Sequence, residues 1–141
     1  DGDAGINRAM GLMIDAYPEE DGVAYMKALA ERARVVREWQ RFFERVPLVL
    51  APVCTEPVYE RGFDLESRER TAALWRECVT LTAVPVLGVP GLAVPTGVVD
   101  GLPTGVQILA PRFREDLCVA AGEAIEARAG MSPRPPIDLA W

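Results

Sequence analysis

Asp100 and Gly101 separate two extended apolar segments and constrain the fold more than any other part of the chain. Both residues tolerate the positive φ of a type I′ turn, which joins two antiparallel strands. Residues 86–99, which precede the turn, contain three glycines and two prolines, and this content excludes a helix and predicts an extended segment with bends. Leu102–Leu109 then forms the return strand. The sequence therefore predicts a β-hairpin.

Helical periodicity occurs on both sides of this hairpin. Apolar residues at helical spacing predict a first helix from Ile6 to Tyr17, which Pro18 ends, and a second from Gly22 to Val46 with one apolar and one charged face. A third helix is predicted from a cap at Asp64 to about Pro85, and a last one from Glu115 to Gly130. The chain thus alternates helices with extended segments.

A further strand is predicted at Leu48–Val53. This short run is rich in branched residues and apolar at both odd and even positions, as in a strand covered on both faces. The order helix, helix, strand, helix, hairpin, helix predicts an α/β fold in which helices pack on a mixed β-sheet. A chain of 141 residues suits one compact unit or a large part of one. The proline-rich tail Ser132–Trp141 is expected to lie along the surface.

Missing residue types narrow the chemistry. The sequence has no His, so a Ser-His-Asp triad, a Cys-His pair and a His-ligated metal site are excluded. Lys27 is the only lysine, and Ser67 and Ser132 are the only serines, which leaves little material for a Ser-Lys catalytic pair. No glycine-rich phosphate loop followed by Lys-Ser or Lys-Thr is present. We therefore expect no catalytic residue, cofactor or metal site here.

Charge and cysteine content limit partners and compartment. The net charge of −6 and the pI near 4.7 argue against nucleic acid as a partner. No apolar run approaches the ~20 residues that a membrane helix needs. Cys54, Cys78 and Cys118 are widely spaced among apolar neighbours, which favours buried, reduced thiols over a disulfide framework. A cytoplasmic location is therefore expected.

Three motifs in one order resemble the amidase signature family of hydrolases. Gly88–Gly97 closely resembles a Gly/Pro-rich stretch near the end of those enzymes, Gly101–Ile108 looks like the strand that follows it, and Arg112–Leu117 resembles the start of the final helix. The helix and strand upstream, through Pro52, are also similar, so the resemblance covers about Asp21 to Trp141. The chain is thus identified as the carboxy-terminal portion of an amidase signature domain, with residues 1–141 as a partial domain.

The resemblance implies a parent amidase that cleaves an amide carbon–nitrogen bond. In that family a Ser nucleophile is activated through a second Ser by an unprotonated Lys, and backbone N–H groups hold the oxyanion. All three residues precede the region that this chain resembles, so none maps onto it. The chain is therefore expected to supply sheet and acyl-pocket walls for a small amide substrate. The alternative is a non-catalytic amidase-like module for binding or oligomerisation.

Pocket walls usually form where loops leave a buried sheet, which selects Cys54, Thr55 and Glu56 as candidate substrate-binding residues. The competing interpretation makes Cys54 a core residue and Thr55 a turn residue. Three other residues favour structural roles over contact with the acyl chain or substrate: Trp75 and Cys78 pack in the core, and the buried amide of Gln107 bonds to backbone.

Lys27 and Ser67 are not expected to take part in catalysis. Lys27 lies on the charged face of its helix, which predicts a solvated side chain, and Ser67 lies near a helix start, where it bonds to local backbone. Part of a sheet presented alone exposes a strand edge and apolar surface, so a homodimer or larger closed assembly is expected. Its contacts are predicted around Trp39 and Phe43 or along Leu48–Val53.

Overall fold

The computed structural model describes residues 2–17 and 19–129, which form two compact units. Unit 1 contains the described residues up to Glu38 together with Cys54–Leu87. Unit 2 contains Trp39–Val53 and the described residues from Gly88 onward. The expected surface position of the tail Ser132–Trp141 falls outside the described residues.

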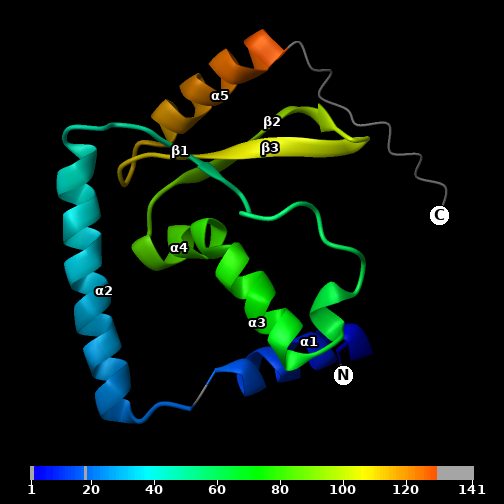
Figure 1. Cartoon of the computed structure of the whole chain (residues 1–141). Coiled ribbons are helices and arrows are strands. Elements are labelled where there is room, and N and C mark those ends of the chain that lie inside the picture. The colour runs from blue at the N-terminus through cyan, green and yellow to red at the C-terminus, as the bar shows by residue number, and fades with distance from the viewer. Residues whose placement is uncertain (1, 18, 130–141) are drawn as a thin grey trace. The chain divides into compact units, whose positions relative to one another are not determined.

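Unit 2 is a three-stranded sheet with one covering helix (Figure 1). The strands are β1 (Val49–Pro52), β2 (Gly91–Val99) and β3 (Leu102–Leu109), in the spatial order β1-β3-β2. Helix α5 (Glu115–Ala129) packs on the sheet, and its Glu115 and Asp116 place negative charge at the helix amino terminus, where the helix dipole favours it. The buried cluster between them contains Val94, Ile108, Ala110 and Cys118.

The hairpin prediction is confirmed. Asp100 and Gly101 both have positive φ, at 52° and 79°, and they join β2 to β3 as an antiparallel pair. The register shifts between Pro95 and Gly97, where β2 carries an extra residue, because proline has no N–H to donate to the ladder. The predicted bend thus lies inside a continuous strand.

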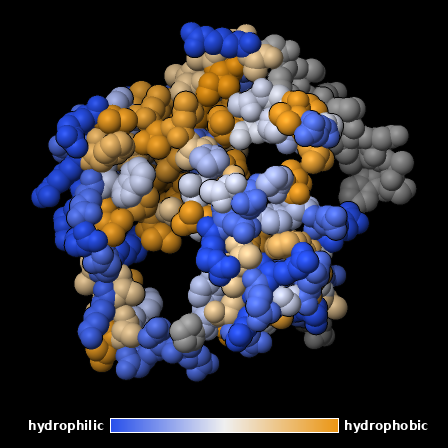
Figure 2. All heavy atoms as spheres, in the orientation of Figure 1, coloured by the Kyte–Doolittle hydropathy of each residue, from blue (hydrophilic) through white to orange (hydrophobic). Residues whose placement is uncertain are grey.

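The α/β class is also confirmed, with two differences in the sheet. The sequence predicts a mixed sheet, which requires a parallel pair of strands. Both pairings among the described strands are antiparallel. The predicted strand at Leu48–Val53 forms as β1, but it is not covered on both faces, since Leu50 is 64% exposed. Figure 2 shows hydrophobic residues gathered around α5 and β1.

Unit 1 is helical. Its elements are α1 (Ala4–Ala16), the 3₁₀ turn η1 (Phe63–Leu65), α3 (Arg68–Glu77), α4 (Val79–Leu87) and most of α2 (Gly22–Phe43). Asp3 caps α1 by accepting hydrogen bonds from the backbone N–H groups of Gly5 and Ile6. Helix α1 packs beside α3 and η1 (Figure 1). The Arg8 side chain donates a 2.6 Å hydrogen bond from Nε to the Leu65 carbonyl, which fastens α1 to η1.

The third predicted helix differs in its start and its continuity. Ser67, rather than Asp64, caps α3: its hydroxyl accepts from the Arg70 N–H at 3.3 Å, while Asp64 lies inside η1. The helix breaks at Cys78, and α4 then continues past Pro85 to Leu87, so residues 86 and 87 are helical rather than extended. Burial of Leu87, which is 3% exposed, favours this last turn although Pro85 lacks an N–H.

Candidate functional site

The loop that follows β1 is fastened to the end of α3 through one carbonyl group. The backbone N–H of Thr55 donates to the Glu77 carbonyl at 3.0 Å, and Thr55 Oγ1 donates to the same oxygen at 3.3 Å. A helix leaves its last carbonyls without partners inside the helix, and Glu77 is the last residue of α3. Thr55 therefore fixes the loop and retains its hydroxyl oxygen only as an acceptor.

Beside this clamp, the side chains of Cys54, Tyr59, Glu77 and Cys78 form a hydrogen-bonded chain. The Tyr59 hydroxyl donates to a Glu77 carboxylate oxygen, and Cys54 Sγ lies 3.5 Å from the Tyr59 oxygen. The single hydroxyl proton of Tyr59 goes to Glu77 while Cys54 is a neutral thiol that donates to Tyr59, and the same proton turns to Cys54 when that thiol ionises. Cys78 lies next to Cys54, and each thiol shifts the pKa of the other. All four residues are half-buried.

The cluster separates the acidities of the two thiols. Burial opposes ionisation of Cys54, but hydrogen bonds from the Glu56 backbone, Tyr59 and Cys78 outweigh it and hold the Cys54 pKa below its ordinary value. Burial, and then the hydrogen bond that Cys78 gives to Cys54, raise the pKa of Cys78 to about 11. Burial and the bond to Glu77 raise the pKa of Tyr59. Cys54 is therefore the more reactive thiol of the pair.

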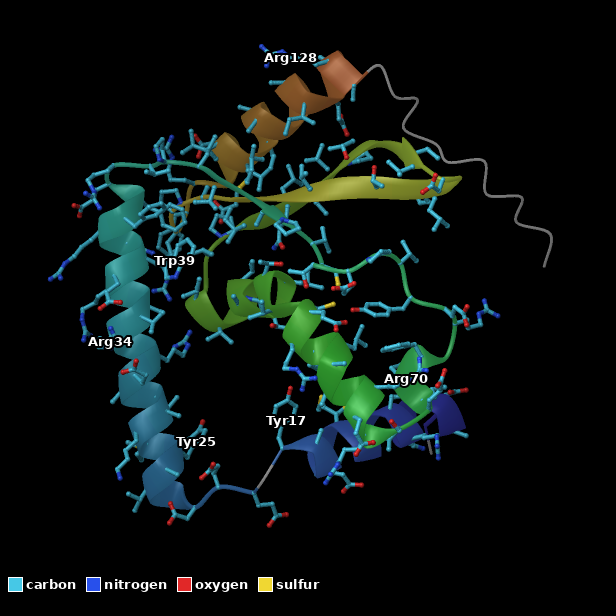
Figure 3. The ribbon with its side chains drawn as sticks, viewed as in Figure 1. Tyr17, Tyr25, Arg34, Trp39, Arg70 and Arg128 are labelled. Carbon is cyan, nitrogen blue, oxygen red and sulfur yellow. The ribbon has the colours of Figure 1, made fainter. Side chains whose placement is uncertain are left out.

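Aromatic contacts hold Tyr59 in place. The Tyr59 and Phe63 rings lie 4.6 Å apart between centroids, and the Arg70 guanidinium lies 4.8 Å from the Phe63 centroid. Arg70 is itself paired with Glu66 at 2.9 Å, and Figure 3 shows it beside η1. The Tyr59 hydroxyl is thus positioned by the contact of its ring with Phe63 as well as by hydrogen bonds.

A hollow lies in unit 2, where two of the sequence motifs meet. A cavity of about 310 Å³ is lined by Gly88, Val89, Pro90, Arg112, Phe113 and Glu115. Arg112 Nε donates to the Gly88 carbonyl at 3.0 Å, and Gly88 has a φ of 64° that favours glycine. Sequence reasoning missed this hollow because residues 88 and 112 meet only through tertiary folding.

The structure places the predicted site residues as follows. Cys54 joins the thiol cluster, Thr55 is exposed but clamped, and Glu56 is exposed, with its backbone next to the Cys54 thiol. The expectation of buried thiols is wrong for Cys54 and Cys78, which are half-buried, and correct for Cys118. Sequence reasoning missed Tyr59 and Glu77 because no local spacing signals their contact with Cys54.

Of the four other residues for which the sequence predicts a structural role, two behave as predicted and two do not. Lys27 is exposed on α2, and Ser67 bonds to local backbone, as expected. Trp75 is 39% exposed, so the prediction of core packing is wrong for it. Gln107 is 3% exposed but its Oε1 has no hydrogen-bond partner, which contradicts the expected backbone bond. That unpaired oxygen costs about 1–3 kcal/mol in a closed core.

Among residues 2–17 and 19–129, no helix has the length and apolar character to cross a membrane. Within the same described residues, no group of three or more His, Cys, Asp or Glu side chains is arranged to hold a metal ion.

Comparison with known proteins gives consistent relatives. The family model described as Amidase matches residues 5–119. The chain is 45% identical over 126 residues to an indoleacetamide hydrolase of Bradyrhizobium japonicum, and the match covers 89% of this chain and 27% of that protein. It is 33% identical over 128 residues to one subunit of the glutamyl-tRNA(Gln) amidotransferase of Pseudomonas fluorescens, covering 89% of this chain and 26% of the relative.

The match spans both units of the structure, and the chain spans about a quarter of the length of these curated relatives. The recognised motifs form the hairpin, the start of α5 and the wall of the hollow at Gly88. The chain therefore belongs to the amidase family.

Proposed function

We propose that this chain is the carboxy-terminal part of an amidase and supplies sheet and acyl-pocket walls without carrying the catalytic residues. The family match over residues 5–119 is the observation that carries the proposal. The composition supports the proposed lack of catalytic residues, because the sequence has no His and only one Lys. That lysine, Lys27, is exposed on α2, and it precedes the pocket-wall candidates by many residues in the sequence.

The proposed pocket wall is the loop Cys54–Glu56. A wall residue needs a fixed backbone and an accessible polar group, and Thr55 has both, since its clamp holds the backbone while its oxygen still accepts. Glu56 contributes an exposed carboxylate beside it. The relative named indoleacetamide hydrolase suggests a small arylacetamide as the substrate class of the parent enzyme. The free cysteines support a cytoplasmic location for that enzyme.

The alternative is a non-catalytic module that binds a second copy of itself. Leu50 on β1 is 64% exposed, and β1 is an edge of the described sheet, which favours pairing along Leu48–Val53. The other predicted contact is disfavoured, because Phe43 is only 4% exposed. We propose a homodimer through β1, which sedimentation at micromolar concentration tests. A monomer of 15.4 kDa contradicts it.

The test of the non-catalytic role is an amide hydrolysis assay on the purified chain. We expect no turnover of indoleacetamide or of a panel of aliphatic and aryl amides above background. The matched variants are Lys27→Ala and Ser67→Ala. Turnover by the unmodified chain that disappears in both variants refutes the proposal and indicates a catalytic pair in this chain.

A further inference from the structure

Two of the three cysteines meet although they lie far apart in the sequence. Cys54 follows β1 and Cys78 caps the carboxyl end of α3, and the two thiols lie close enough for each to shift the pKa of the other. Cys118 belongs to the other unit, where it is buried with its Sγ 3.7 Å from the Ile108 carbonyl. The pair is thus specific to the site that contains Tyr59 and Glu77.

The backbone holds the two cysteines together independently of their thiols. The residue after Cys54 and the residue before Cys78 are joined by the Thr55–Glu77 clamp, which consists of two hydrogen bonds. A disulfide needs Cβ atoms about 3.8 Å apart and a specific dihedral angle. Because the clamp holds the residues next to the two cysteines together, rotation of the side chains brings the sulfurs to bonding distance without unfolding of the loop or of α3. Both side chains are half-buried, so a small oxidant reaches them.

The surroundings of Cys54 and Cys78 favour different protonation states of the two thiols. Hydrogen bonds favour the thiolate of Cys54, whereas Cys78 stays protonated at neutral pH. The thiolate is the form that attacks a peroxide, and a nearby protonated thiol is suited to resolve the product. The pair therefore has an attacking member and a resolving member.

We propose that Cys54 and Cys78 form a peroxide-sensitive dithiol that closes reversibly to an intramolecular disulfide. In the first step the Cys54 thiolate attacks hydrogen peroxide, the O–O bond breaks, and Cys54 sulfenic acid and hydroxide form. In the second step the Cys78 sulfur attacks the Cys54 sulfur, the S–O bond breaks, and water leaves with the Cys78 proton. Cysteine sulfur is oxidised, peroxide is reduced, and an external thiol reverses the reaction.

Closure of this disulfide alters the loop that contains the candidate pocket wall. Cys54 loses its thiol proton and therefore its hydrogen bond to Tyr59, and the loop becomes covalently attached to the end of α3. An effect on amide hydrolysis by the parent enzyme follows only if the proposed function is correct. The disulfide itself does not depend on that function.

The experiment treats the folded 141-residue chain with equimolar hydrogen peroxide, alkylates the remaining thiols with iodoacetamide, and maps the peptides by mass spectrometry without reduction. We expect a Cys54–Cys78 cross-link that dithiothreitol reverses, with Cys118 alkylated only after unfolding. In Cys78→Ala, Cys54 should stop at the sulfenic acid and be trapped by dimedone. Cys118→Ala is the matched control and should form the same cross-link.

Two further measurements make the result decisive. Tyr59→Phe should slow alkylation of Cys54 at neutral pH several-fold, because the thiolate loses a hydrogen bond, while circular dichroism shows an unchanged helix content. The chain in urea should form the cross-link more slowly than the folded chain. Cys54 oxidised to sulfinic acid without a cross-link, or equal cross-linking to Cys78 and Cys118, overturns the proposal. Amide turnover has no part in this readout.

Discussion

Substitutions at Gly101, in the turn with Asp100, test the cost of positive φ directly, because an added side chain there is not crowded by other atoms. A Cβ added at Gly101 meets no heavy atom within 4 Å, and the same holds for Gly11 in the middle of α1. The two glycines differ in φ, which is 79° at Gly101 but helical at Gly11. Substitutions at the two positions therefore separate the cost of positive φ from the cost of crowding.

Gly101→Val is expected to lower the free energy of unfolding by about 1 kcal/mol or more. A left-handed conformation costs a residue with a Cβ ~1–2 kcal/mol, and more when the side chain is β-branched. Loss of unfolded-state entropy offsets ~0.4–1 kcal/mol of this. Gly11→Ala should instead raise the free energy of unfolding by ~0.5–1 kcal/mol, because alanine favours the helix.

Urea denaturation followed by circular dichroism measures the free energy of unfolding of both variants. In a thermal melt, a change of 1 kcal/mol corresponds to a shift of ~2–4 °C in Tm for a chain of about this size. Gly101→Asn is the matched control, because Asn tolerates positive φ and should be nearly neutral. If Gly101→Val is as stable as Gly101→Asn, the assignment of a type I′ turn is wrong.

Two further substitutions test the packing of each unit. Gly105→Ala should destabilise the chain by ~1–3 kcal/mol, because its Cβ would lie 2.9 Å from the Val94 carbonyl oxygen on β2; an unchanged urea midpoint refutes the register. Ser67→Ala should cost ~1 kcal/mol by removing the cap of α3, and Ser67→Asp should restore most of it; equal stability of the two variants refutes the cap.

The sequence predicts elements whose cause is local. The hairpin is recovered because positive φ at Asp100 and Gly101 depends on those residues themselves. The third helix ends at Leu87, shortly after the predicted end near Pro85, because burial of Leu87 favours a last turn that Pro85 disfavours locally. The one-sided exposure of β1 is also missed, since the apolar character of Leu50 says nothing about what covers it.

The candidate site is predictable only in part. The loop at Cys54–Glu56 is identified because it follows a strand, but its partners come from a distant helix end. Glu77 accepts from Thr55 because helix termini leave carbonyls unpaired, and this contact brings Cys78 to Cys54. No periodicity or motif encodes that meeting, so the dithiol is visible only in the folded chain.

The most direct measurement of the proposed role replaces the matched 126-residue segment of the Bradyrhizobium japonicum indoleacetamide hydrolase with this chain. We expect the chimera to hydrolyse indoleacetamide, and Thr55→Ala or Glu56→Ala to raise KM several-fold. Glu123→Ala, on the exposed side of α5, is the control and should leave kcat/KM unchanged. A folded chimera without turnover contradicts the role of this chain as part of an amidase, and unchanged KM in both loop variants contradicts its pocket wall.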